Sequence, residues 1–111
     1  MTEKNYIFLE TDKMEWTPTD SPGVFYKSLR YDKNSKSGAV LIRMDQDSSY
    51  PEHVHSNGEE FLVLKGELII GDRVFPEGSY VYSPPQSKHH PSTRTGAILF
   101  SVFHGKIINT K

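Results

Sequence analysis

The chain has 111 residues, of which 35% are hydrophobic and 12% aromatic, so large rings must supply much of any core. This length supports one hydrophobic core, and we predict a single domain over residues 1–111. The formal net charge of −1 and the scattered lysines give no basic surface for nucleic acid or for an anionic membrane. Because the chain has no run of 18 apolar residues and no apolar signal segment, a cytoplasmic location is expected.

Short runs rich in β-branched and aromatic residues alternate with turn signals along the chain. The runs that we predict to form strands are 24–31, 39–45, 60–64, 67–70, 79–83 and 97–104. Turn signals such as Lys65-Gly66 and Thr95-Gly96 separate them, and no stretch favours a helix. Many short strands with regular turns predict an all-β fold, as an antiparallel sandwich or barrel.

The first dozen residues contain the apolar run Tyr6-Ile7-Phe8-Leu9. Two interpretations stay open: an extra strand that packs on a partner subunit, and an edge strand of the same barrel. A chain of this length can hardly cover its own apolar sheet faces. We therefore expect a homodimer, with a monomer whose N-terminal segment folds back over that face as the alternative.

Three histidines have the spacing of a metal site. His53 and His55 stand two apart, and His89 follows behind Pro84-Pro85. Residues two apart on a strand point the same way, so two imidazoles can converge on one ion while a distant histidine completes the set. Nitrogen ligands with one carboxylate suit a divalent ion such as Fe, Zn, Mn or Ni, and a chain without cysteine favours an open site over a structural zinc site.

Periodicity alone leaves the remaining ligands undecided. Either Glu59 or Glu60 could supply the oxygen, since the residues that alternate with each of them are apolar. His89 and His90 point to opposite faces of a strand, so only one of them can enter the site. His104 ends the last apolar run, where a surface or hydrogen-bonded histidine is the more common case.

Two motifs resemble those of a known family. From His53 the chain reads H-x-H-x3-E-x6-G, and from Gly78 it reads G-x5-P-x-Q-x2-H-x3-T. These sequences resemble the two cupin motifs. The chain departs from them at turn positions: Asp47 and Gln86 replace glycines, and Thr93 replaces an asparagine.

The segments 58–66, 76–80 and 83–85, together with Trp16-Thr17-Pro18, are similar to the cupin domain of ChrR-type anti-sigma factors. This resemblance extends from about residue 16 to about residue 103 and implies a single cupin domain, folded as an antiparallel β-barrel or jelly roll. The metal ligands that it implies are His53, His55, Glu59 and His89.

Six further residues are candidates for binding a substrate beside the metal. They are aromatic residues of predicted strands and one arginine in an apolar run: Arg43, Phe61, Tyr80, Tyr82, Phe100 and Phe103. Core packing is the alternative for each aromatic residue. An inward Arg43 could bind a carboxylate or enolate through its guanidinium, whereas an outward Arg43 would simply be a polar surface residue.

Two functions follow from the resemblance, because no nucleotide-binding or hydrolase motif is present. The first is a mononuclear metal dioxygenase acting on a diketone, hydroxyketone or similar chelating substrate, as is known among similar cupins. If the protein is an enzyme, this oxidoreductase chemistry is expected before isomerisation or hydrolysis. The second is a non-catalytic zinc-binding sensing or ligand-binding module, like the cupin half of ChrR-type factors. The sequence shows no helical segment of the kind that grips the sigma factor in those proteins, which weakens the second interpretation.

Overall fold

The structure, a computed structural model, describes residues 5–109, with side chains described through Ile107. The described chain contains a short 3₁₀ helix, η1 (Thr11–Lys13), followed by strands. The strands are β1 (Thr17–Pro18), β2 (Val24–Asp32), β3 (Ser37–Met44), β4 (His53–His55), β5 (Glu59–Gly66), β6 (Leu68–Ile70), β7 (Arg73–Phe75), β8 (Tyr80–Ser83), β9 (Lys88–His89), β10 (Pro91–Ser92), β11 (Ala97–Phe103) and β12 (Ile107–Asn109). Within the described residues, no helix has the length and apolar character needed to cross a membrane.

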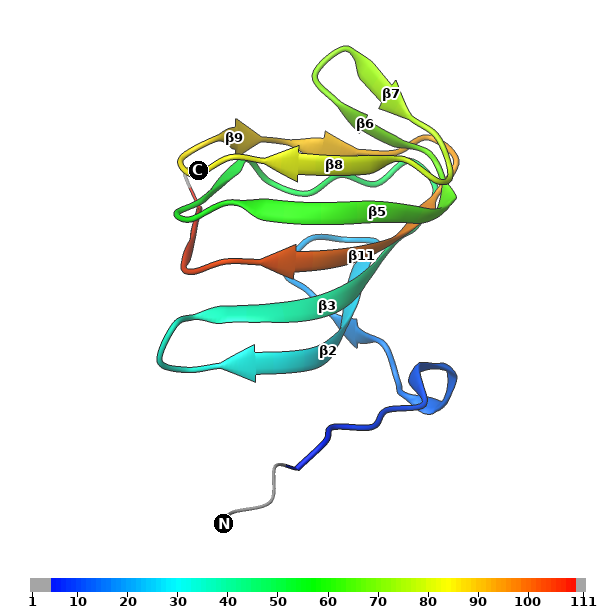
Figure 1. Ribbon diagram of the computed structural model, residues 1–111. Coiled ribbons are helices and arrows are strands. Elements are labelled where there is room, and N and C mark those ends of the chain that lie inside the picture. The colour runs from blue at the N-terminus through cyan, green and yellow to red at the C-terminus, as the bar shows by residue number, and fades with distance from the viewer. Residues whose placement is uncertain (1–4, 110–111) are drawn as a thin grey trace.

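The strands form three antiparallel sheets. The largest has six strands in the order β1-β2-β3-β11-β5-β8, and the smaller sheets have the orders β10-β6-β7 and β12-β4-β9. In Figure 1, β8, β5, β11, β3 and β2 lie side by side as one broad layer, and the β6–β7 hairpin stands out at a corner. The predicted all-β antiparallel fold is confirmed.

All six predicted runs contain a strand, and their ends differ from the observed ones by two residues at most. The structure adds strands that lie outside these runs: β1, β4, β7, β9, β10 and β12. Each of these has only two or three residues, which is too short for a period-two pattern to emerge.

The described N-terminal residues do not form the strand that the sequence suggested. Residues 5–10 form no strand in this structure, so the interpretation as an edge strand of the same barrel is wrong for them; residues 1–4 lie outside the described part of the chain. The chain is first anchored at Thr11, whose carbonyl oxygen accepts a 2.6 Å hydrogen bond from the Lys27 ammonium group. Trp16 then packs on the same lysine, with Nζ 4.4 Å from the ring centroid. Residues 6–9 precede this anchor and remain exposed.

Alternation along β5 decides what faces the interior. Glu59, Phe61 and Val63 are buried, whereas Leu62 and Leu64 point outward. The buried apolar cluster collects side chains from several strands and fills the space behind the large sheet. Its members are Val24, Met44, Phe61, Val63, Leu68, Ala97 and Leu99.

Two turns keep the shape that glycine usually provides. Asp47 and Gln86 have positive φ angles of 62° and 69°, in the left-handed region that costs a non-glycine residue about 1–2 kcal/mol. Gln86 is held there because its backbone N–H donates to the His55 carbonyl (3.1 Å) and its side-chain amide donates to the Ser56 carbonyl (3.0 Å). The two departures from the motif therefore leave the turn conformation intact, and the strained Gln86 lies beside β4.

Candidate metal centre

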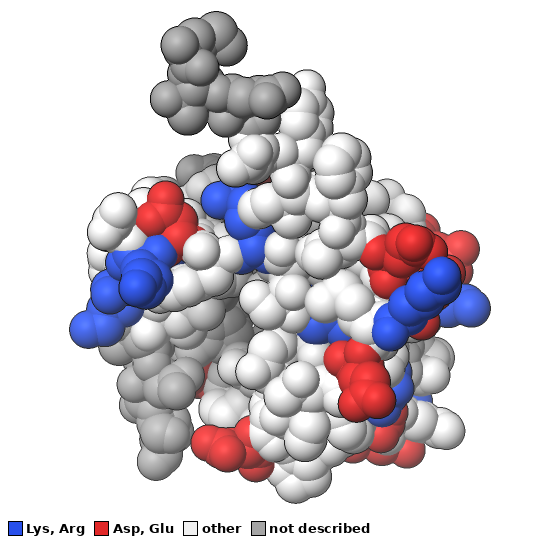
Figure 2. Space-filling model, turned by 90° about the horizontal axis from the view of Figure 1, so that it is seen from below, with Lys and Arg blue, Asp and Glu red and all other residues white. Residues whose placement is uncertain are grey.

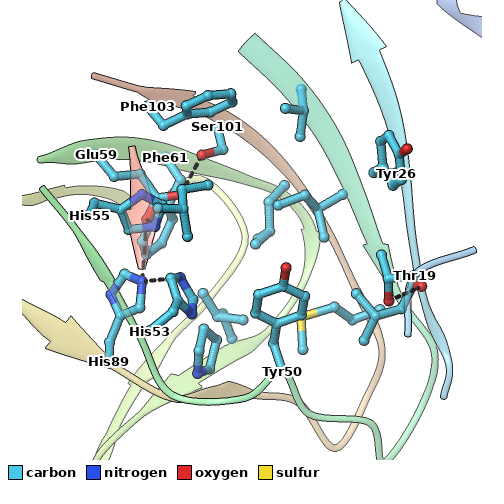
Figure 3. Close-up of a pocket in the computed structure, with 18 of the residues that line it drawn as sticks. Thr19, Tyr26, Tyr50, His53, His55, Glu59, Phe61, His89, Ser101 and Phe103 are labelled. Atoms are coloured by element: carbon cyan, nitrogen blue, oxygen red, sulfur yellow. Dashed lines mark hydrogen bonds and ion pairs between the residues drawn. The ribbon is translucent and has the colours of Figure 1, made fainter. Parts of the chain in front are cut away.

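Four polar side chains converge from three neighbouring strands. His53 and His55 lie on β4, and β9 pairs with this strand so that His89 stands directly opposite His53. After the turn at Gly58, Glu59 begins β5 and points to the same place (Figure 3). All four residues are buried.

The candidate ligand atoms form a tight group within 4.8 Å of one another. Nε2 of His89 lies 3.1 Å from Nε2 of His53 and 3.3 Å from Oε1 of Glu59. Nε2 of His55 lies 2.9 Å from the same Oε1 atom. Three imidazole nitrogens and one carboxylate oxygen thus face a common point, which fits a divalent metal site.

Unsatisfied atoms support this fit. Although Nε2 of His55 and Oε1 of Glu59 are in close contact, neither has a hydrogen-bond partner of acceptable geometry, and both are buried. Buried polar atoms in proteins are nearly always hydrogen-bonded. Atoms that approach closely without pointing at each other are the arrangement expected of ligands directed at a shared cation.

His53 is prepared for this role. Its Nδ1–H donates to the carbonyl oxygen of Pro51 at 2.9 Å, so the lone pair of Nε2 is free to face the site. Burial lowers the pKa of His53 to about 4, against the smaller opposing effect of the bond to Pro51. The ring is therefore neutral at pH 7, as a metal ligand must be.

Glu59 supplies the negative charge. Burial by itself would raise the pKa of Glu59, but the adjoining His55 and His89 rings and the Ser101 hydroxyl lower it well below its usual range. The Ser101 hydroxyl donates to Oε2 at 2.5 Å, which leaves Oε1 with the imidazoles. The site consequently combines imidazole nitrogens with one carboxylate anion.

A cavity of about 250 Å³ adjoins the cluster and is lined mainly by apolar side chains from the large sheet. Figure 3 shows the polar cluster at one end and the aliphatic wall at the other, with the Tyr50 hydroxyl pointing into the space between them. The apolar lining of the cavity includes Val24, Val40, Ile42, Met44, Leu68 and Leu99.

The sequence of the chain matches the model of the ChrR cupin-like domain over residues 4–108. The chain belongs to this cupin family. No curated protein matches the sequence.

Solved structures share the fold at low sequence identity. A provisionally assigned acetylacetone dioxygenase from Methylibium petroleiphilum PM1 superposes with a TM-score of 0.91 at 19% identity, covering 100% of this chain and 85% of that chain. An acetylacetone dioxygenase from Acinetobacter johnsonii superposes with a TM-score of 0.83 at 16% identity, covering 100% of this chain and 80% of that chain. The structure of Rhodobacter sphaeroides SigE in complex with the anti-sigma ChrR superposes with a TM-score of 0.71 at 21% identity, covering 85% of this chain and 50% of that chain. These similarities establish the cupin fold.

Of the six residues predicted to surround a substrate, Phe61 and Phe103 line the cavity of this cupin. The other four lie outside it, which corrects that expectation. Tyr80 and Tyr82 are on the outward face of β8, with exposed fractions of 61% and 54%, and Phe100 alternates with the inward Leu99 and Ser101 of β11.

Arg43 also points away from the cavity. Its guanidinium carbon lies 4.2 Å from the centroid of the Phe25 ring and 5.2 Å from that of Trp16, and its Nε lies 3.5 Å from a carboxylate oxygen of Asp45. These cation–π contacts place the arginine on the outer face of the large sheet, where no substrate in this cavity can reach it.

The residues that competed with the candidate ligands are placed elsewhere. His90 is exposed next to the buried His89. Glu60 points outward and accepts a 2.7 Å hydrogen bond from the Tyr80 hydroxyl, and His104 contacts its other oxygen at 2.9 Å. His104 is thus a hydrogen-bonded surface histidine, the case that the sequence favoured.

Sequence analysis missed polar residues of the cavity, among them Tyr50 and Ser101. Tyr50 packs edge-on against His53, with ring centroids 5.1 Å apart, and its backbone N–H donates to the Pro91 carbonyl oxygen. Ser101 is a single polar residue within the otherwise apolar strand β11, and it is 1% exposed. That interruption was a signal, because a buried hydroxyl needs an acceptor.

Proposed function

We propose that this cupin binds one divalent metal ion through His53, His55, Glu59 and His89, and that a small chelating molecule reaches the ion through the adjoining cavity. The observation that carries the proposal is the convergence of the four ligand atoms within 4.8 Å at the polar end of an apolar cavity. In its specific form, the proposal is an iron-dependent dioxygenase acting on a diketone or hydroxyketone.

The charge of the site favours an anionic oxygen ligand. Three neutral imidazoles and the Glu59 carboxylate would leave one net positive charge on a divalent ion, which a singly charged enolate neutralises. When bound, the ion would polarise the ligand's oxygens as a Lewis acid and, as Fe(II), would permit reaction with O₂. The cavity residues would hold the rest of the molecule: Phe61 and Phe103 exclude water, and the Tyr50 hydroxyl offers a hydrogen-bond donor.

The test joins metal analysis with oxygen uptake. Protein purified without an affinity tag should contain close to one divalent ion per chain, and the Fe(II)-loaded form should consume O₂ with acetylacetone or a related diketone or hydroxyketone. A matched form loaded with zinc should bind the same compounds and consume no O₂, since zinc has no redox chemistry. Iron-loaded protein that consumes no O₂ with any of these compounds would contradict the dioxygenase.

A zinc-binding sensing module is the second candidate, and the ChrR cupin-like family match over residues 4–108 favours it. On this proposal the same four ligands hold zinc without turnover, and the cavity binds a ligand whose presence alters a protein contact. Zinc in the purified protein, no oxygen uptake, and retention of a helical sigma-factor partner would support the sensor over the enzyme.

We further propose that two copies pair through the outer face of the large sheet. Leu62 and Leu64 on β5 are 36% and 43% exposed there, beside the exposed Tyr80 and Tyr82 of β8. The segment Tyr6–Leu9 is also exposed, and Figure 1 shows the chain near its N-terminus running away from the sheets. On the face seen from below in Figure 2, uncharged residues (white) cover much of the middle, and most of the charged residues lie toward the sides. Two unpartnered apolar surfaces on one chain suit reciprocal cover by a second copy.

Light scattering at micromolar concentration should accordingly give twice the 12.7 kDa mass of one chain. Leu62→Lys should shift the protein to the single-chain mass, because it places a charge in the proposed interface. Val74→Lys is the matched control, since Val74 is exposed on the protruding β7 and should leave the dimer intact. A wild-type mass of 12.7 kDa that does not change on concentration would defeat the dimer.

A further inference from the structure

We infer that Ser101 holds Glu59 as a one-oxygen ligand and thereby keeps two positions of the metal open for a chelating substrate. This inference rests on the proposed metal binding. The number of oxygens that Glu59 gives to the ion determines whether one or two coordination positions stay open. The set of three histidines and one glutamate does not by itself fix that number.

The two oxygens of Glu59 have separate partners. Oε2 accepts the hydrogen bond from the Ser101 hydroxyl at 2.5 Å, whereas Oε1 lies 2.9 Å from Nε2 of His55 and 3.3 Å from Nε2 of His89. Figure 3 shows the serine on the far side of the carboxylate from the histidines. One oxygen is therefore directed at the candidate ion and the other is tied back to β11.

Ser101 has little alternative to this bond. It is 1% exposed, and its neighbours across the sheet are Val40 on β3 and Phe61 on β5, both apolar. If Glu59 turned to present both oxygens to the ion, a buried hydroxyl would lose its acceptor, which is unfavourable. The serine thus opposes chelation of the ion by the carboxylate.

The consequence lies in the number of positions left to other ligands. An ion that takes six ligands, three of them imidazole nitrogens, retains two open positions when Glu59 supplies one oxygen and only one when it supplies two. A chelating substrate needs two. Ser101 is in this sense a positioning residue that favours two-oxygen substrates over ligands that bind through a single atom.

The test compares two probes on cobalt-loaded wild-type protein and Ser101→Ala. Acetohydroxamate binds a metal through two oxygens, and azide binds through one atom. We expect Ser101→Ala to retain cobalt and to bind azide with almost unchanged affinity. Its affinity for acetohydroxamate should fall by about tenfold or more, which is the size of effect seen when residues that hold metal ligands are changed. The visible absorption of cobalt, which depends on coordination number, should change as well.

Thr93→Val is the matched control, since it removes another buried hydroxyl, which donates to the Glu67 carbonyl oxygen at 2.6 Å and lies outside the cavity. It should leave both probe affinities and the cobalt absorption as in the wild type. Equal losses for both probes in Ser101→Ala, or no change in either, would overturn the inference and assign the serine to packing.

Infrared spectroscopy of the wild-type protein gives a second measurement that needs no variant. On cobalt loading, the separation between the two carboxylate stretching bands of Glu59 should widen, as for a one-oxygen ligand. A narrowed separation, as for chelation, would overturn the inference. Wild-type protein that binds no cobalt would instead contradict the proposed metal site, so the two failures are distinguishable.

Discussion

Replacing His53, His55 or His89 by alanine should each remove most of the bound metal. Each substitution deletes a direct ligand, and the loss should exceed the roughly 10–100-fold that changes outside the ligand shell cause. Glu59→Ala should weaken binding less, because three imidazoles remain. Metal content per chain after dialysis, measured by elemental analysis alongside a thermal unfolding curve, separates ligand loss from unfolding.

Neighbouring residues provide the controls. His90→Ala changes the same strand region as His89→Ala but removes an exposed ring, and Glu60→Ala removes a carboxylate that points away from the site toward Tyr80 and His104. Both variants should keep nearly all of the metal. If His90→Ala loses the ion while His89→Ala retains it, the register that pairs His53 with His89 would be wrong, and His90 would be the residue that faces the site.

The spacing of the motif residues distinguished Glu59 from Glu60 where the periodicity of β5 could not. On β5 both faces are apolar, so alternation left Glu59 and Glu60 equivalent, and only the resemblance to the cupin motif distinguished them. The structure turns Glu59 inward with Phe61 and Val63. Whether that glutamate faced the interior depended on which side of β5 the second layer covers, and neighbouring strands distant in sequence decide this.

The direction of Arg43 shows the same limit. It alternates with Leu41 within an apolar run, so the pattern allowed either face. Its outward position is stabilised by Phe25 and Trp16, which come from earlier segments that a local pattern cannot bring together. Aromatic residues that looked suitable for a pocket were likewise divided between the two faces of the large sheet, with Phe61 inside and Tyr80 outside.

The hydrogen bonds behind the candidate ligands were beyond prediction for a different reason. Ser101 lies 42 residues after Glu59, and the partner of a buried hydroxyl depends on strand order. A polar residue within β11 indicated that some acceptor was near, without indicating which one. Strand composition and motif spacing thus predicted the fold and the candidate ligands. The hydrogen bond from Ser101 to Glu59 could be found only once the pairing of β11 with β5 was known.

Metal content should fall steeply as the pH drops below about 6, because ligating histidines must be neutral and protons compete for imidazoles with an ordinary pKa near ~6.5. Burial lowers the pKa of His53 to about 4, so protons compete for this ring only well into the acid range. Glu59, whose pKa is held well below its usual range, stays ionised throughout and does not cause the loss. Elemental analysis after dialysis at stepped pH measures the curve.

Unfolding must be separated from release, because the metal-free protein also loses stability in acid. The folded-state pKa of His53, about 4, lies below the ~6.5 of an unfolded chain, so the unfolded state binds more protons between these values and becomes favoured as the pH falls through them. Trp16 fluorescence reports on unfolding, and metal should rebind when a folded sample returns to neutral pH. Metal content that stays constant from neutrality to about pH 4 in folded protein would show that histidines are not the ligands, since no imidazole metal site resists that proton concentration unless its affinity is extreme.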